Sequence, residues 1–241
     1  MWLINSSIGR KVIMSVTGMA LILFMTFHCC MNLVALFSEE AYNMICALLG
    51  ANWYAVAATV GLGALAVCHI VYAFILTAQN RRARGDNRYA VTEKPATVEW
   101  ASQNMLVLGI IVLLGLGLHL FNFWYNMMFA ELIHTKFMYE PSNGFAHIDV
   151  PFHPSNGFAY IKYTFANPVY VVLYVIWIAA LWFHLSHGFW SAMQTVGING
   201  KVWFNRWKTI GNIYVTLLML GFLVVVLAFA FHCAPSLCCA A

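Results

Sequence analysis

Long apolar runs, separated by shorter polar stretches, make up most of this chain. A helix needs roughly 20 residues to cross a hydrocarbon core of about 30 Å, and the sequence contains five runs of that length and no sixth. Their helical period does not indicate which face is buried, because the runs are apolar all round. The predicted membrane-spanning helices are residues 12–37, 53–79, 104–130, 168–190 and 209–232.

The composition agrees with this pattern. Of the 241 residues, 63% are hydrophobic and only 8% are charged, whereas an ordinary soluble domain has roughly 25% charged residues. The first run is too long for a cleaved signal peptide and lacks an A-x-A site before a polar chain. We therefore expect an all-α integral membrane protein in which residues 1–241 form a single transmembrane domain.

Basic residues are concentrated in the segments that precede the first, third and fifth runs. They are Arg10, Lys11, Arg81, Arg82, Arg84, Arg88, Lys94, Lys201, Arg206 and Lys208. The loops on the other side hold only Lys136 and Lys162, against five acidic residues. The positive-inside rule therefore places the N-terminus in the cytoplasm and the C-terminus outside. The net charge of +4 reflects this asymmetry and gives no reason to expect a nucleic-acid partner.

The longest outer loop contains a short repeat, in which residues 141–146 recur as residues 154–159. Each copy holds an Asn-Gly pair, which is a strong turn or hairpin signal, and we expect a small cap on the outer face. His134, His147 and His153 lie in or beside this loop, where an exposed histidine more often has no special role.

The seven cysteines show no C-x-x-C or C-x-x-C-H spacing, which argues against c-type haem attachment and against a zinc site. Cys233, Cys238 and Cys239 lie at the outer end, where disulfides can form in an oxidising compartment. The cysteines within the runs are equally well interpreted as small apolar filler.

Four of the nine histidines lie one apiece in the first four runs, each past the middle of its run. Because successive spans run in opposite directions, His28 and His119 lie towards the outer face, whereas His69 and His184 lie towards the inner face. We call them the outer pair and the inner pair, after the predicted orientation. At about 1.5 Å of rise per residue, the two pairs should be roughly 10 Å apart along the membrane normal.

An ionisable side chain at bilayer depth is costly and therefore indicates function. Two histidines from two helices are the usual ligands of a six-coordinate haem b, so we predict one haem b for each pair, with the four histidines as iron ligands. A proton relay is the main alternative, but such pathways usually include Asp or Glu, and these runs contain neither. Zinc is disfavoured, because two ligands leave a tetrahedral site half empty.

His187 lies three residues after His184 and shares much of its helix face. Spacing alone therefore leaves either histidine as the ligand, and depth slightly favours His184. His232 ends the fifth run without a partner at its depth, and we interpret it as interfacial. Small residues near the paired histidines allow close helix packing or the approach of a flat macrocycle; they are Gly61, Gly63, Ala64, Gly115, Gly117 and Gly188.

Several motifs occur together along the chain. Residues 6–11 (Ser-Ser-Ile-Gly-Arg-Lys) are followed by Thr17-Gly18 and by His28-x-x-x-Asn32, and the fourth run carries residues 183–191 (Phe-His-Leu-Ser-His-Gly-Phe-Trp-Ser). With one histidine in each of spans 2 and 3, nearly the whole chain resembles the cytochrome b membrane subunit of succinate:quinone oxidoreductases (succinate dehydrogenase and fumarate reductase). The resemblance is to the single-subunit form with five helices and two haems.

The resemblance implies that the first four helices form a bundle around two stacked b haems, with the fifth packed outside them. Spans 1 and 3 would hold the distal haem and spans 2 and 4 the proximal haem, which assigns His184 as the ligand and leaves His187 as an extra histidine. It also implies exchange of electrons with a membrane quinone, such as menaquinone. The implied partners are an iron–sulfur subunit and a flavoprotein subunit that holds the dicarboxylate site, in the bacterial cytoplasmic membrane.

One position departs from some relatives, in which a Glu two residues before the span 4 ligand is linked to proton transfer; here that residue is Trp182. The resemblance implies a quinone site near the distal haem, where Glu39 and Glu40 are candidate acceptors of the protons from quinol. A solvated pair of loop acids is an equal alternative. Asn32 and His187 are candidate neighbours of haem or quinone.

Two other functions stay open on the sequence. The chain could be the cytochrome b anchor of another respiratory dehydrogenase, such as a hydrogenase. In a different class, a small secondary transporter can also carry histidines within the membrane.

Overall fold

The computed structural model describes residues 6–84, 100–133 and 153–238. Within these ranges the regular elements are all helices, and five of them are long and apolar enough to cross a membrane. The chain is therefore a multi-pass α-helical membrane protein. The spanning elements are α2 (Ser7–Leu33) with η1 (Val34–Leu36), α4 (Trp53–Arg84), α6 (Met105–His119) with η2 (Leu120–Phe129) and α7 (Ala130–Leu132), α9 (Pro168–Val196) and α10 (Trp203–Ala230).

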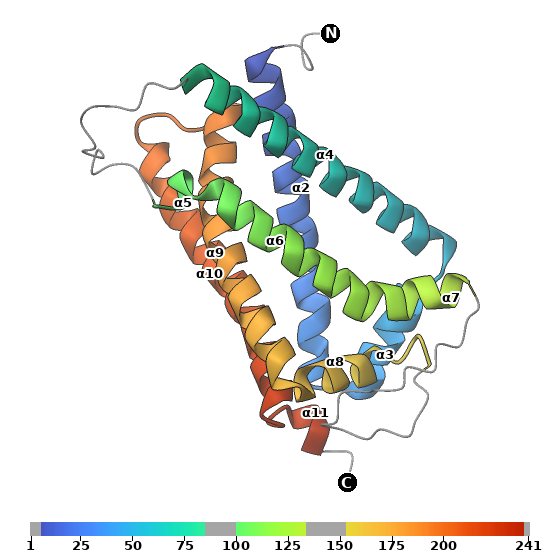
Figure 1. Cartoon of the computed structure of the whole chain (residues 1–241). Helices are drawn as coiled ribbons and strands as arrows, with labels where there is room; N and C mark the ends of the chain where they lie inside the picture. The colour runs from blue at the N-terminus through green and yellow to red at the C-terminus, as the bar shows by residue number, and fades with distance from the viewer. Residues whose placement is uncertain (1–5, 85–99, 134–152, 239–241) are drawn as a thin grey trace.

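The five predicted spans are all found, and α2 begins at the end of the bundle opposite α11 (Figure 1). Several helices extend beyond the apolar runs that predicted them. The α2 helix begins at Ser7, α4 continues to Arg84 and α10 begins at Trp203. These extensions carry basic residues, whose long side chains allow a helix to continue past the hydrocarbon while the charge stays in water.

Short helices cover the C-terminal end of the bundle (Figure 1), and we call them the cap: α3 (Glu39–Leu48), α8 (Gly157–Ala166) and α11 (Pro235–Cys238). The second copy of the repeat begins α8, because the Asn156 side chain accepts a hydrogen bond from the Ala159 N–H at 3.0 Å. Asparagine is a preferred helix N-cap, so this Asn-Gly pair starts a helix of the cap directly after a turn at residues 154–155. The first copy, with His134 and His147, lies outside the described residues.

The α10 helix, the fifth span, packs closely on two of the other four spans. It packs along α9 and on α2, around the main cluster of buried apolar side chains. Glycines allow this close approach: a methyl group at Gly211 would lie 2.6 Å from Phe189 on α9, and one at Gly221 would lie 2.6 Å from Cys29 on α2.

The α4 helix is the least buried of the five spans. Among the spanning helices it packs closely only on α2. None of its most apolar stretch is buried within the chain, compared with 33% of that stretch in α9 and in α10. An apolar helix with so little protein around it leaves most of its surface to lipid or to a bound molecule.

Candidate functional site

The four histidines of the apolar spans form two pairs in space. The ring centroids of His28 (α2) and His119 (α6) are 5.8 Å apart, with the ring planes inclined at 85°. Those of His69 (α4) and His184 (α9) are 6.4 Å apart, with an inclination of 72°. These are the outer pair and the inner pair that span direction predicts.

The spacing within each pair leaves room for a metal ion between the rings. A metal–imidazole bond is about 2 Å long and the ring centre lies roughly 1 Å beyond the nitrogen, so two imidazoles across one ion have centres roughly 6 Å apart. Neither α2 with α6 nor α4 with α9 is among the closely packed helix pairs. In each pair, therefore, the side chains meet while other contacts hold their helices apart.

The two pairs lie at different levels along α2. The His69 ring contacts Thr17 and Gly18, and His28 lies eleven residues beyond Thr17 on the same helix. Eleven residues correspond to roughly 16 Å of helical rise, which is more than the expected separation of roughly 10 Å. The difference arises because His69 contacts α2 at Thr17 and Gly18. This point is nearer the N-terminal end of α2 than the position of His69 along α4 suggests.

In the inner pair, the Nδ1 atom of one histidine has a hydrogen-bond partner and the Nδ1 atom of the other has none. Thr17 Oγ1 lies 3.1 Å from His69 Nδ1. His184 Nδ1 is buried and has no hydrogen-bond partner within the described part of the chain. A buried polar atom without a partner requires an explanation, and one explanation is that this pair holds a ligand or an ion.

Aromatic side chains enclose the outer pair. They come from the helices of the pair themselves and from α9 and α10: Phe24, Phe123, Tyr174, Trp177 and Phe222, with centroids 5.2 to 6.1 Å from the histidine ring they contact. Such rings exclude water and lower the local dielectric, so polar interactions between the two histidines are stronger than in solvent.

A chain of hydrogen bonds leads away from the outer pair. The Tyr174 hydroxyl lies 3.5 Å from His119 Nδ1, and Asn122 Nδ2 donates to the Tyr174 oxygen at 3.4 Å. Asn122 belongs to η2, a π-helical segment that begins directly after His119. In that segment Asn126 Nδ2 donates to the Phe121 carbonyl at 2.9 Å. Because π-helical turns are frequent at functional sites, η2 makes this end of α6 a candidate functional region.

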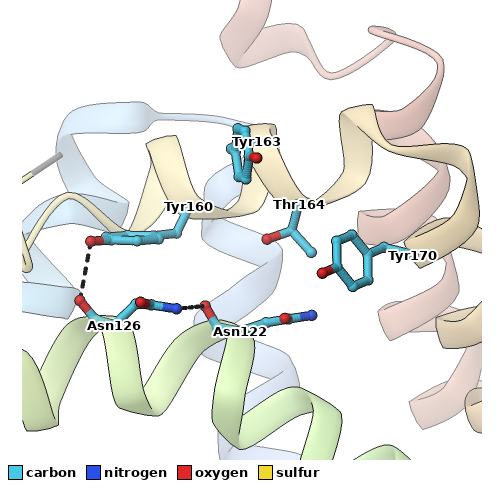
Figure 2. Close-up of a pocket in the computed structure, with 6 residues that line it drawn as sticks. All are labelled: Asn122, Asn126, Tyr160, Tyr163, Thr164 and Tyr170. Carbon is cyan, nitrogen blue, oxygen red and sulfur yellow. Dashed lines mark hydrogen bonds between the residues drawn. The ribbon is translucent and has the colours of Figure 1, made fainter. Parts of the chain in front are cut away.

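A small polar pocket lies between η2 and α8, next to this chain (Figure 2). In Figure 2, the hydroxyls of Thr164 and Tyr170 point into the space over Asn122. The full lining is Asn122, Asn126, Tyr160, Tyr163, Thr164 and Tyr170. The sequence analysis missed this pocket. The available signal was the pair of asparagines, four residues apart in an apolar run and directly after a predicted ligand.

Asn32 connects the outer pair to the cap. Its Nδ2 donates to the His28 carbonyl at 2.8 Å and lies 3.4 Å from His28 Nε2. Its Oδ1 accepts a hydrogen bond from the Tyr42 hydroxyl at 3.2 Å. The structure thus brings this candidate neighbour into direct contact with His28.

The cap supplies neutral polar groups on this side of the outer pair. Tyr42 on α3 is hydrogen-bonded to Cys46, and burial raises the pKa of Tyr42 well above its usual value. Burial also raises the pKa of the Cys46 thiol to about 11 and that of Tyr160 to about 12. The three side chains therefore stay uncharged near neutral pH.

Glu39 and Glu40 are exposed in the first turn of α3, where Ser38 caps the helix by accepting from the Ala41 N–H at 3.1 Å. Acidic residues in a first turn stabilise a helix through its dipole, so both have a structural role. Among the described residues a further acid at this end is Glu131, whose Oε2 accepts a hydrogen bond from the Ala51 N–H at 3.1 Å.

The structure separates His184 from His187. It is His184 that meets His69, whereas His187 packs edge-on against Trp190 with centroids 4.9 Å apart. Trp182 contacts neither histidine pair through its ring nitrogen, because its Nε1 donates a hydrogen bond to Thr216 Oγ1 of α10 at 2.9 Å.

The remaining predicted positions lie away from the pairs. His153 Nδ1 is 2.7 Å from Ser155 Oγ in a local turn, and His232 is exposed at the end of α10. Cys233 is a free, exposed thiol. Cys239 and the side chain of Cys238 lie outside the described residues. The prediction that these cysteines can form disulfides therefore also lies outside them.

Within the described ranges, no three or more His, Cys, Asp or Glu side chains gather as a metal-binding group. Each histidine pair offers two ligands, which suits an ion whose other ligands come from a cofactor, as the iron of a porphyrin does. Comparison with known proteins gives the site no family, because no family model, no curated protein and no solved structure matches the chain.

Proposed function

We propose that this chain is the di-haem cytochrome b membrane anchor of a succinate:quinone or quinol:fumarate oxidoreductase. The observation that carries the proposal is the meeting of four intramembrane histidines in two pairs, each spaced for one shared metal ion. The motifs in spans 1 and 4, which resemble those of this enzyme family, link the two pairs to succinate and fumarate.

The residues present fit two bis-histidine haems. His28 and His119 would hold one haem, and His69 and His184 the other. Methyl groups at Gly61, Gly63 and Gly117 would meet nothing within 4 Å, so these glycines do not serve helix packing within the chain and leave smooth surfaces beside the pairs. When bound, each haem iron would accept and release one electron.

The protein side chains would position the imidazoles and exclude water. Thr17 and Tyr174 lie next to the Nδ1 atoms of His69 and His119, which leaves the Nε2 atoms of these two rings for the iron. Aromatic rings surround the outer pair. The two pairs, separated by roughly 16 Å of rise along α2, would carry electrons between the two ends of the bundle.

The polar pocket beside the outer pair has room for about one water molecule, so it is a candidate site for a hydrogen-bonded water between a quinone near the outer pair and the cap. Asn122, Thr164 and Tyr170 can donate there, one helical turn from His119. Glu39 and Glu40, exposed on the same cap, are the candidate acceptors of protons released when quinol is oxidised. Menaquinone is the quinone that the family resemblance favours.

The N-terminal end of the bundle would bind the partner subunits. Arg206 lies over the Trp203 ring at 5.2 Å, and Lys208 lies over the Trp190 ring at 5.0 Å. Such pairs of cationic and aromatic side chains anchor helices at the membrane surface. An iron–sulfur subunit at this end would stand next to the inner pair, and a flavoprotein subunit beyond it would carry out the dicarboxylate chemistry.

A secondary transporter is the alternative from another class, and the unpartnered His184 Nδ1 is the observation that favours it, because a proton relay needs a free ring nitrogen. The optical spectrum of the purified full chain separates the two functions. The cytochrome should show reduced b-type bands at about two haems per chain, whereas a colourless folded protein would overturn the proposal.

The choice among electron-transfer complexes needs the partners. We expect an iron–sulfur protein and a flavoprotein to co-purify with the chain, and succinate to reduce the haems of that complex. Reduction by hydrogen and not by succinate would instead identify a hydrogenase anchor.

A further inference from the structure

Thr17 makes two kinds of hydrogen bond at once. Its side-chain hydroxyl donates to the backbone carbonyls of Ile13, at 2.8 Å, and Met14, at 3.1 Å. A hydroxyl has one proton, and that proton is directed at these carbonyls. The contact of 3.1 Å between Thr17 Oγ1 and His69 Nδ1 therefore uses an oxygen lone pair.

This arrangement selects one tautomer of His69. Because the Thr17 oxygen can only accept, Nδ1 must carry the ring proton and donate it. A neutral imidazole protonated at Nδ1 has its lone pair at Nε2, the atom that then binds a metal.

Gly18 provides the space for the ring. A methyl group at this position would lie 3.1 Å from His69 Cε1 and 3.6 Å from its Nδ1, so the ring would have to move. Thr17 and Gly18 thus act on the same side of His69: one supplies the acceptor for Nδ1–H, and the other lets the ring approach closely enough to use it.

We propose that the Thr17-Gly18 pair on α2 is a positioning element for His69, which fixes the ring and its tautomer so that Nε2 faces His184. The metal-binding part of this inference rests on the proposed function, whereas the tautomer does not. The other three histidines are held differently: His119 by a phenol, His28 by an amide, and His184 with no partner at Nδ1 among the described residues.

The first test is Thr17→Val, which keeps the shape of the side chain and removes the acceptor. Loss of such an outer hydrogen bond typically lowers metal affinity by about 10- to 100-fold, and we expect the inner haem to be lost selectively at about the lower end of that range. The haem that remains bound at this site should have a more positive midpoint potential, because an imidazole without the hydrogen bond is a weaker donor to iron. Thr17→Ser, which restores the hydroxyl, should recover both properties.

Thr26→Val is the matched control. Thr26 lies on the same helix, donates to the carbonyl four residues earlier at 2.9 Å and is hydrogen-bonded to Tyr214 instead of a histidine. It should leave both haems in place at their wild-type potentials. If Thr17→Val and Thr26→Val give the same haem content and the same inner-haem potential, Thr17 is structural only and the inference is overturned.

Gly18→Ala tests the same element without changing a hydrogen-bonding group. It should displace the His69 ring and release the inner haem, while Gly200→Ala, in the loop before α10, where a methyl group meets nothing within 4 Å, should retain it. Retention of the inner haem by Gly18→Ala would contradict the role given to Gly18.

The tautomer can be measured even without haem. In the full chain labelled with ¹⁵N-histidine, the His69 resonances, assigned by their absence from His69→Gln, should show a protonated Nδ1 and an unprotonated Nε2. A protonated Nε2 would overturn the inference whether or not haem is bound. A colourless protein with the expected tautomer would overturn the proposed function alone.

Discussion

His69 on α4 meets His184 on α9 with ring centroids 6.4 Å apart, although the two helices do not pack closely on one another. The same relationship holds for His28 on α2 and His119 on α6, at 5.8 Å. Direct contact between the helices would close the space between the rings. A pair of side chains that meets between separated helices is therefore the geometry that a shared ligand requires.

Replacement of one histidine should remove one haem. In His119→Gln the outer pair loses a ligand, so the haem content should fall from about two to about one per chain, with the inner haem retained. The pyridine haemochrome assay and a redox titration of the remaining haem check this. His153→Gln, in the turn before α8, is the control and should keep both haems. Loss of the inner haem alone would contradict the pairing.

His184 and His187 should behave differently. His184→Gln removes the side chain that meets His69 and should abolish the inner haem, whereas His187→Gln removes a side chain packed on Trp190 and should leave haem content unchanged. The comparison uses the same spectra on both proteins. If His187→Gln were the variant that lost the inner haem, the geometry of α9 given above would be wrong.

Tyr174→Phe should weaken the outer site. The variant removes the hydroxyl between His119 and Asn122 and leaves a buried amide without this partner, which should lower the free energy of unfolding by about 1 kcal/mol. We also expect the outer haem to dissociate about 10-fold more readily on detergent dilution. Tyr170→Phe, one turn earlier on α9, is the matched control. Equal haem retention in the two variants would remove Tyr174 from the site.

Neutralising the acidic pair of α3 should slow quinol oxidation without changing haem content. Because Glu39 and Glu40 are both exposed, one can substitute for the other and water can replace both, so the double variant Glu39→Gln/Glu40→Gln should lose less than the roughly 100-fold expected for a buried base. Quinol-dependent haem reduction in the assembled complex measures the rate. An unchanged rate would leave these residues only their role in the first turn of α3.

The Cys46 thiol should resist alkylation near neutral pH. Burial raises its pKa to about 11, and the thiolate is the reactive form, so its labelling by a maleimide should stay slow at pH 7.5 and increase as the pH approaches 11. Cys233, which is exposed, should label first. Peptide mapping by mass spectrometry after timed labelling distinguishes the two. Rapid labelling of Cys46 at pH 7.5 would show that the cap opens readily.

The sequence by itself predicted the five spans, their alternating direction and the pairing of the histidines by depth. Each of these depends on a one-dimensional quantity. The length of an apolar run sets a span, basic residues set its direction, and the position of His28 or His69 along its run sets depth. The separation of the two pairs was less well predicted, because depth along one helix does not say where on its neighbour the side chain will rest.

Only the tertiary structure decided what lies around each histidine. An apolar helix with no polar face carries no signal of its rotation about its own axis, so helical periodicity could not choose between His184 and His187, a choice that came from depth and from the family resemblance. Nor could it say that α4 would be the most exposed span. Contacts such as Thr17 with His69 and Tyr174 with His119 join residues 52 and 55 positions apart. They form because helix rotation and packing bring those side chains together, and no local pattern along the chain encodes that rotation.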